Sequence, residues 1–111
     1  MAHGAEPFAL VVRFTVRHGA ESAFDDLTAR TVAKITTQEP GTLIYTCHHV
    51  EGQPRQRIFY ELYRDRAAFD AHEQQPHVKD FLAQREELLE AIEVDFMNMI
   101  VGKPSTSSEA A

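Results

Sequence analysis

The stretch from Gln56 to Phe81 constrains the fold most, because a strand-like and a helix-like periodicity meet in it. Side chains in Arg57–Arg64 alternate between two faces, and one carboxylate, Glu61, lies between two aromatic rings on one face. Asp65 is then typical of a helix N-cap, and Pro76 opens another helix, where its missing N–H costs nothing. We therefore expect a pocket between strand and helix, with these residues near one end of it: Tyr63, Phe69, His72 and His77.

The rest of the chain predicts an alternation of strands and helices around this stretch. In order, we expect a strand at 8–16, a helix from about 22 to 37, strands at 42–50 and 57–64, two helices that end near residues 89–91, and a strand at 93–101. This β-α-β-β-α-β order is that of a ferredoxin-like α+β fold, an antiparallel sheet with helices on one face. We expect one domain at 8–101, a flexible N-terminus at 1–7 and a disordered, Ser-rich tail at 102–111.

The hairpin between the second and third strands decides which histidine faces the helices. If residues 51–56 form its loop, antiparallel pairing places His48 beside Phe59 and Thr46 beside Glu61. A one-residue slip would present the alternate residues of the second strand instead: His49, Cys47 and Tyr45. The sequence leaves this choice open.

The face of the sheet without helices predicts an interface between copies of the chain. Alternation places several apolar side chains on it: Val11, Tyr60, Leu62, Met97 and Met99. An exposed patch of that kind on a small domain usually marks an interface, and two copies packed sheet against sheet would bury it with two-fold symmetry. We therefore expect a homodimer through this sheet face.

Composition excludes several classes of partner and cofactor. The net charge of -6 does not favour binding to nucleic acid or to an anionic membrane, and no apolar run approaches 18 residues. The single cysteine, Cys47, cannot form an internal disulfide, which fits a cytoplasmic protein, as does an N-terminus without the features of a signal peptide. No GxGxxG follows a strand and no metal-ligand motif is present, so we expect neither a flavin or nicotinamide cofactor nor a metal.

The pattern Y-E-x-Y-x-D-x-A-A-F-x-A-H-x-x-x-P-H-x-K-x-F runs from Tyr60 to Phe81, and an E-P-G turn at Glu39–Gly41 and Tyr45 precede it. Over roughly residues 8–101 the chain thereby resembles the antibiotic biosynthesis monooxygenase (ABM) family, small ferredoxin-like proteins that include quinol monooxygenases. This resemblance implies a dimeric α/β barrel, and the H-x-x-x-P-H arrangement is similar to the quinol monooxygenase branch and to the branch that processes a phosphorylated signal molecule. Haem-degrading relatives carry Asn, Trp and His at positions that here are Val12, His72 and Leu82, which argues against haem.

The residues together suggest a site for a flat aromatic or quinol-like substrate and O₂. We expect an apolar pocket with His72 and Glu61 as its few polar groups, walled by Val12, Phe14, Phe59, Tyr63 and Phe69, with His77 near its end. His72, or His48 in the first register, is the expected catalytic base, and Glu61 would orient that histidine or bind a substrate hydroxyl. The hypothesis is a cofactor-independent monooxygenase of a quinol or other small phenol.

Other readings stay open at this point. Glu61 could pair with Arg13 or Arg64, and His77 could be structural at its helix N-terminus. An iron centre could also form from His48, Glu61 and His72, with or without His77, although no ligand motif supports one. The chain could instead be an isomerase of a small phosphorylated carbonyl compound, or a non-catalytic ligand-binding dimer. A phosphate would need several cations at the pocket mouth, and the candidates are few: Arg13, Arg64, Arg66 and Lys79.

Overall fold

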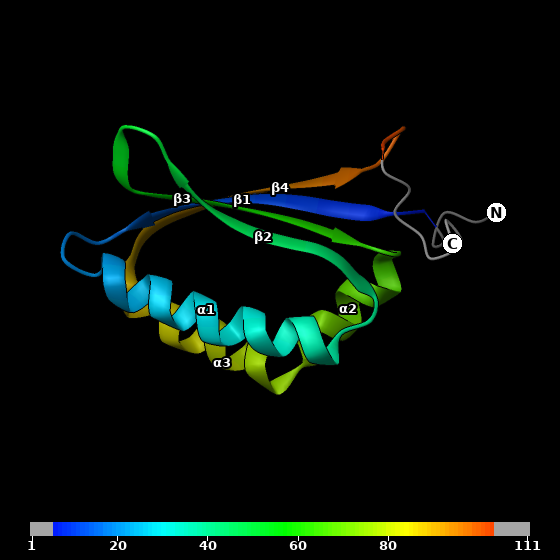
Figure 1. Cartoon of the computed structure of the whole chain (residues 1–111), viewed down its shortest axis with the longest axis horizontal. Helices are drawn as coiled ribbons and strands as arrows, with labels where there is room; N and C mark the ends of the chain where they lie inside the picture. The colour runs from blue at the N-terminus through cyan, green and yellow to red at the C-terminus, as the bar shows by residue number, and fades with distance from the viewer. Residues whose placement is uncertain (1–5, 104–111) are drawn as a thin grey trace.

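Four antiparallel strands form one sheet, and the helices all lie on the same side of it (Figure 1). The computed structural model describes residues 6–103. Its elements are β1 (Phe8–Val16), α1 (Glu21–Gln38), β2 (Thr42–Val50), β3 (Gln53–Tyr63), α2 (Arg66–Gln74), α3 (Pro76–Arg85), a 3₁₀ turn at Glu86–Leu88 and β4 (Leu89–Asn98). The strand order is β2-β3-β1-β4, which confirms the ferredoxin-like α+β fold. Most of the expected tail lies outside the described residues, as do residues 1–5.

Helix α1 buries one stripe of residues and begins without a side-chain cap. Phe24, Leu27, Thr31 and Ile35 are buried at helical spacing. Ser22 and Asp25 have the spacing of a capping box, but the helix begins one residue before Ser22, after Ala20, with no side-chain cap. Asp25 is instead occupied by a buried guanidinium, that of Arg57, through contacts of 2.8 and 3.0 Å. The ion pair therefore replaces the cap that the local sequence suggested.

The fourth strand begins earlier than the sequence predicted. Helix α3 ends at Arg85, and after the 3₁₀ turn the chain is extended from Leu89, whereas the sequence suggested a helix up to about residues 89–91. At the start of the segment E-E-L-L-E-A-I-E-V-D-F the apolar residues fit the period of a helix as well as that of a strand. Ile92, Val94 and Phe96 recur at every second position, and this period of two residues is that of a strand and not of a helix. The strand also ends at Asn98 rather than at Val101.

The β2–β3 hairpin is tighter than expected, and this changes the register. Strand β3 begins at Gln53, and the turn before it contains Gly52 at a φ of 75°. Cys47 lies opposite Phe59 and Tyr45 opposite Glu61, so both registers considered above are wrong. The β2 residues that face the helices are those of the slipped alternative, His49, Cys47 and Tyr45, although each pairs with a residue two positions earlier in β3 than that slip implied. His48 therefore lies opposite Ile58 and faces away from the helices.

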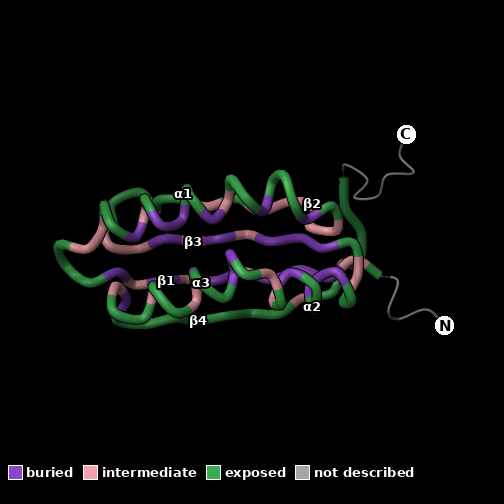
Figure 2. The backbone as a smooth tube through the Cα atoms, turned by 90° about the horizontal axis from the view of Figure 1, so that it is seen from below, coloured by how far each residue is buried: buried purple, intermediate pink, exposed green. Residues whose placement is uncertain are grey.

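The hydrophobic core lies between the helices and the two central strands. Residues along β1 and β3 are mostly buried, whereas β4 at one edge of the sheet is exposed along most of its length (Figure 2). An aromatic cluster fills this core, with ring centroids of Phe14 and Phe59 4.6 Å apart and of Phe14 and Phe24 5.2 Å apart. The helix-facing side of β4 remains open, since Phe96 is 60% exposed. The layer beneath the helices is thus closed in the centre and open towards β4.

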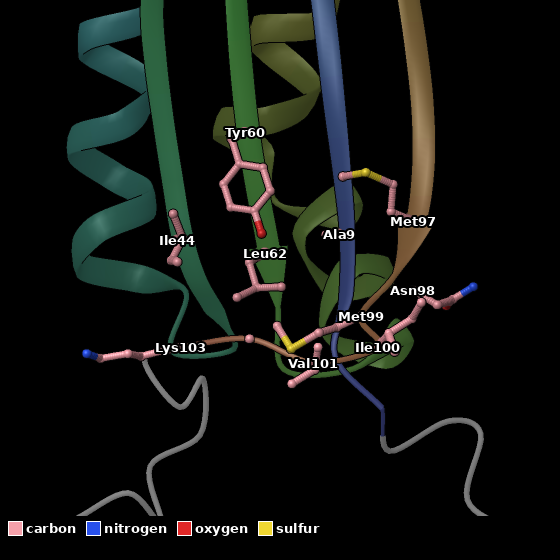
Figure 3. Close-up of a pocket in the computed structure, with 11 residues that line it drawn as sticks. Ala9, Ile44, Tyr60, Leu62, Met97, Asn98, Met99, Ile100, Val101 and Lys103 are labelled. Carbon is pink, nitrogen blue, oxygen red and sulfur yellow. The ribbon is translucent and has the colours of Figure 1, made fainter.

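The outer face of the sheet is apolar only at one end. Figure 3 shows Ile44, Tyr60, Leu62 and Met97 on this face, with residues 99–103 passing across the ends of the strands. These residues line a shallow hollow of about 420 Å³, and Leu62 is only 1% exposed. The C-terminal segment thus covers part of a face that the sequence suggested would be bare. None of the helices in residues 6–103 has the length and apolar character to cross a membrane.

Candidate functional site

A cavity of about 230 Å³ lies between the centre of the sheet and helices α2 and α3. Its walls come from β1 and β4 on the sheet side and from α2 and α3 on the helix side, and they are mostly apolar. The polar side chains that line it are few: Tyr45, Glu61, His72, Glu73 and Arg85. An apolar hollow with a few convergent polar groups is the usual form of a small-molecule site.

The structure brings together five of the nine predicted site residues. Those that line the cavity are Val12, Phe14, Glu61, Phe69 and His72. The other four lie elsewhere. Phe59 and Tyr63 are fully buried behind the wall, and His77 faces a buried carboxylate rather than the cavity. His48 is exposed on the opposite face of the sheet, where its Nε2 lies 2.9 Å from the hydroxyl of Thr46.

Glu61 is a buried carboxyl group on the cavity wall. The neighbouring Tyr63 hydroxyl donates a 2.7 Å hydrogen bond to its Oε1, so Tyr63 supports the site rather than lining it. Burial raises the pKa of Glu61 to about 7, although the hydrogen bond from Tyr63 acts in the opposite direction. Burial and the nearby Glu61 also raise the pKa of Tyr63, which stays protonated as a donor. Glu61 can therefore exchange a proton near neutral pH, a property common in catalytic carboxyl groups. It pairs with neither Arg13 nor Arg64.

His72 enters the cavity from the last turn of α2. Its ring packs against Tyr63 and Tyr45, with centroids 5.2 and 5.6 Å apart. Its Nδ1 lies 2.7 Å from Oε1 of Glu39. The orienting carboxylate is thus Glu39 and not Glu61, which the sequence had suggested for this role.

Glu39 is the residue of this region that sequence reasoning missed. The sequence pattern assigns it only to the E-P-G turn after α1, yet its side chain is buried and contacts two histidines. Besides His72 it binds Nε2 of His77 at 2.5 Å, and the Thr42 hydroxyl donates to it at 2.7 Å. The signal that could have revealed it is the pair of histidines around Pro76, which need a shared acceptor once both are buried.

Arg85 and Tyr45 also line the cavity. The sequence indicated Tyr45 only through the slipped register and the family pattern, and it did not indicate Arg85. The guanidinium of Arg85 lies 5.6 Å from the ring centroid of Phe14 and 5.7 Å from that of Phe81. Burial raises the pKa of Tyr45 well above its ordinary value, so its phenol remains protonated. Tyr45 lies opposite Glu61 in the sheet, and both side chains line the cavity. Among the described residues, none of the four cations considered earlier lines this cavity.

The residues considered as iron ligands do not come together in the described part of the chain. Within residues 6–103 no three His, Cys, Asp or Glu side chains are grouped as a metal ion requires. The iron centre considered from His48, Glu61 and His72 is not assembled, because His48 lies on the other face of the sheet.

Comparison with known proteins places this fold and sequence in one family. Residues 7–84 match the model of the ABM family, antibiotic biosynthesis monooxygenase. The chain is 27% identical over 84 residues to the uncharacterized protein sll1783 of Synechocystis sp., which covers 76% of this chain and 56% of that protein. This chain thus matches little more than half the length of that relative.

Solved structures support the same relationship. Rv0793 from Mycobacterium tuberculosis has a TM-score of 0.79 at 29% identity, over 89% of this chain and 99% of that one. PA3566 from Pseudomonas aeruginosa has a TM-score of 0.79 at 25% identity, over 90% and 100% of the two chains. A Caulobacter crescentus protein reaches a TM-score of 0.84 at 18% identity, over 89% and 94%, a likeness that concerns the fold alone.

Proposed function

The chain belongs to the antibiotic biosynthesis monooxygenase family, and on that premise we propose that it is a cofactor-independent monooxygenase of a quinol or another small phenol. The observation that carries this proposal is the joint presence of His72 and Glu61 in one apolar cavity. The Glu61 carboxyl can exchange a proton near neutral pH because burial raises its pKa to about 7, and the His72 imidazole can accept a proton at an unprotonated ring nitrogen.

The size of the cavity favours a substrate with one ring. Its volume of about 230 Å³ lies below the roughly 300–1,000 Å³ typical of sites for drug-sized ligands. Val12, Phe14 and Phe69 supply flat apolar contacts, and Glu61 on the same wall can bind a ring hydroxyl. A hydroquinone presents two hydroxyl groups on an apolar ring, so it matches the polar and apolar parts of this lining.

In the proposed reaction the base takes a phenolic proton and O₂ is reduced by the substrate itself. The proton moves to Nε2 of His72, and the phenolate passes one electron to O₂. The ring radical and superoxide then combine in a new C–O bond, and the imidazolium returns the proton to give a hydroperoxide. Its O–O bond breaks as the hydrogen on the same ring carbon leaves as a proton, and the departing oxygen leaves as water. A quinol and O₂ thus give a hydroxyquinone and water, with all four electrons supplied by the quinol.

The apolar walls have a role in this scheme. They separate the radical pair and the hydroperoxide from bulk water, which would otherwise protonate or divert them. Tyr45, whose phenol stays protonated, can donate a hydrogen bond to the developing oxyanion.

We also propose that the protein is a homodimer through the outer face of the sheet. The support is the apolar end of that face, where Ile44, Tyr60 and Met97 surround a shallow hollow (Figure 3). In a dimer with a two-fold axis, this patch of one copy would pack against the same patch of the other copy. The cavity lies on the opposite face of the sheet, so this contact leaves it accessible.

Oxygen uptake with a panel of hydroquinones tests the function. We expect uptake with one-ring quinols, formation of the hydroxyquinone, and a fall in kcat of about 100-fold or more in His72→Gln. His18→Gln is the matched control, because His18 is exposed in the turn before α1 and should leave the rate unchanged. Binding of quinols without any O₂ uptake would contradict the proposal and favour a non-catalytic ligand-binding protein.

A further inference from the structure

Glu39 makes more buried contacts than any other carboxylate around the cavity, yet it does not line the cavity itself. We infer that Glu39 is the positioning residue for His72: its carboxylate holds the imidazole proton on Nδ1, so that Nε2 is the unprotonated nitrogen available to a substrate. The inference rests on the proposed function for its kinetic consequence, but the position of the proton can be measured without any substrate.

Three donors converge on this one carboxylate. Oε1 lies 2.7 Å from Nδ1 of His72 and accepts a 2.7 Å hydrogen bond from the Thr42 hydroxyl, and Oε2 lies 2.5 Å from Nε2 of His77. A buried carboxylate must be compensated, and these contacts are charge-assisted hydrogen bonds. A carboxylate only accepts, so each nitrogen that faces it carries a hydrogen.

The break between α2 and α3 explains how both histidines reach the same side chain. His72 is in the last turn of α2 and His77 in the first turn of α3, and Gln75 between them is extended. Pro76 forces this break, because a proline suits the first turn of a helix but not its interior. His72 and His77 are five residues apart, a spacing at which one continuous helix would not direct both side chains to the same point. The break between the helices directs both rings at Glu39.

The tautomer of His72 follows from these contacts. A neutral imidazole has one N–H, and the carboxylate binds it at Nδ1, which leaves a lone pair on Nε2. Nε2 makes no hydrogen bond to any described residue. It is nevertheless absent from the buried polar atoms that lack a partner, so this nitrogen is not fully buried. Since His72 lines the cavity, the geometry leaves Nε2 in contact with the space where a substrate would lie.

His77 has a different task in the same group. By binding Oε2 it prevents the carboxylate from rotating, so that Oε1 stays aligned with His72. It also belongs to the N-terminal turn of α3, whose dipole favours a nearby anion, whereas Glu39 itself caps the C-terminal end of α1, where an anion is disfavoured. His77 is thus a supporting residue and does not touch the substrate.

The direct test is the ¹⁵N NMR spectrum of the histidine rings in the wild-type protein at a pH where His72 is neutral. We expect His72 as a single tautomer with hydrogen on Nδ1. Hydrogen on Nε2 would overturn the inference without any variant being made. If no quinol is turned over, this spectrum still decides the role of Glu39, while the proposed function fails separately.

Glu39→Gln adds a kinetic test. An amide has one accepting oxygen and one donating nitrogen, so at least one of the two histidines must change tautomer. Where His72 changes, kcat should fall about 10-fold or more with KM within about 2-fold, as expected for loss of a general base. Where only His77 changes, kcat should be retained. A change at His72 with an unaltered kcat, or unaltered tautomers at both rings, would overturn the inference.

His77→Gln is the matched variant. Its side-chain amide can still donate to Oε2 of Glu39, so we expect the wild-type tautomer of His72 and a kcat within about 3-fold of wild type. A loss as large as that of Glu39→Gln, with the His72 tautomer intact, would show that the group matters only for folding and would overturn the inference.

Discussion

The Tyr63 hydroxyl donates its hydrogen bond to Glu61, a residue two positions earlier on the same strand, at 2.7 Å. Both side chains lie on the helix-facing side of β3, and both are buried. The contact gives a carboxyl group on the cavity wall one fixed donor, while burial keeps its pKa near 7. It is the reason why a fully buried tyrosine influences the chemistry of a cavity that it does not line.

The raised pKa of Glu61 predicts a specific dependence of stability on pH. The folded protein holds this proton between the usual pKa of 4.5 and about 7, where the unfolded chain has lost it. The protonated Glu61 therefore contributes fully to the free energy of unfolding below pH 4.5, and this contribution is lost as the pH rises from 4.5 through 7. The total loss is about 3 kcal/mol at most. Glu61→Gln cannot titrate, so its free energy of unfolding relative to wild type should increase between pH 4.5 and 8. Equal pH profiles in urea titrations of the two proteins would contradict this.

Tyr63→Phe should move the titration of Glu61 upwards. The hydrogen bond from Tyr63 lowers the pKa of Glu61, so its removal should raise the midpoint above about 7. The variant should also lose about 1–2 kcal/mol of stability above that midpoint, because the ionised carboxylate then lacks a donor. ¹³C NMR titration of the Glu61 carboxyl measures the shift. Tyr60→Phe, on the outer face of the same strand, is the control and should leave the midpoint in place.

The fold could be predicted from the sequence because its signals are local and agree with one another. The alternation in β1 and β3, the Asp65 cap, whose side chain accepts from the amide of Ala68, and Pro76 at the start of α3 each act within a few residues. The order of elements then leaves few topologies. The start of β4 was missed because the residues after Arg85 fit either period.

The candidate site was predicted only in part, because two of its determinants are not local. Placement of His48 depended on the register of the hairpin, and the observed pairing with Ile58 instead of Phe59, a shift of one residue, moves its side chain to the other face of the sheet. Glu39 lies 33 residues from His72, and nothing in the local E-P-G pattern shows that its side chain turns inward. His72 and Glu61 were found because strand and helix periodicity within one short stretch place them together.

Gly41 predicts a packing constraint next to the Glu39 group. A Cβ at this position would lie 2.7 Å from the Cβ of Ala68 in α2, which no ordinary contact allows. Gly41→Ala should therefore destabilise the protein by about 1–3 kcal/mol, as overpacking does. The double variant Gly41→Ala, Ala68→Gly removes the clash and should recover part of the loss, despite the cost of about 1 kcal/mol for glycine in a helix. Additive losses in thermal unfolding would contradict this account.

Two substitutions on opposite faces of β4 test which side of the sheet joins two copies. Met97 lies on the outer face, opposite Ala9, whereas Ile92 lies on the helix-facing side, opposite Phe14, and is 41% exposed. A buried aspartate without a partner is strongly unfavourable, so Met97→Asp should weaken a dimer through the outer face by about 10-fold or more. Ile92→Asp introduces the same charge on the same strand but away from that face, so it should leave the association unchanged. Sedimentation or light scattering over a concentration series measures both. Dissociation by Ile92→Asp alone would place the contact at the open side of β4, beside the cavity, and a monomer in the wild type would remove the dimer from the proposal.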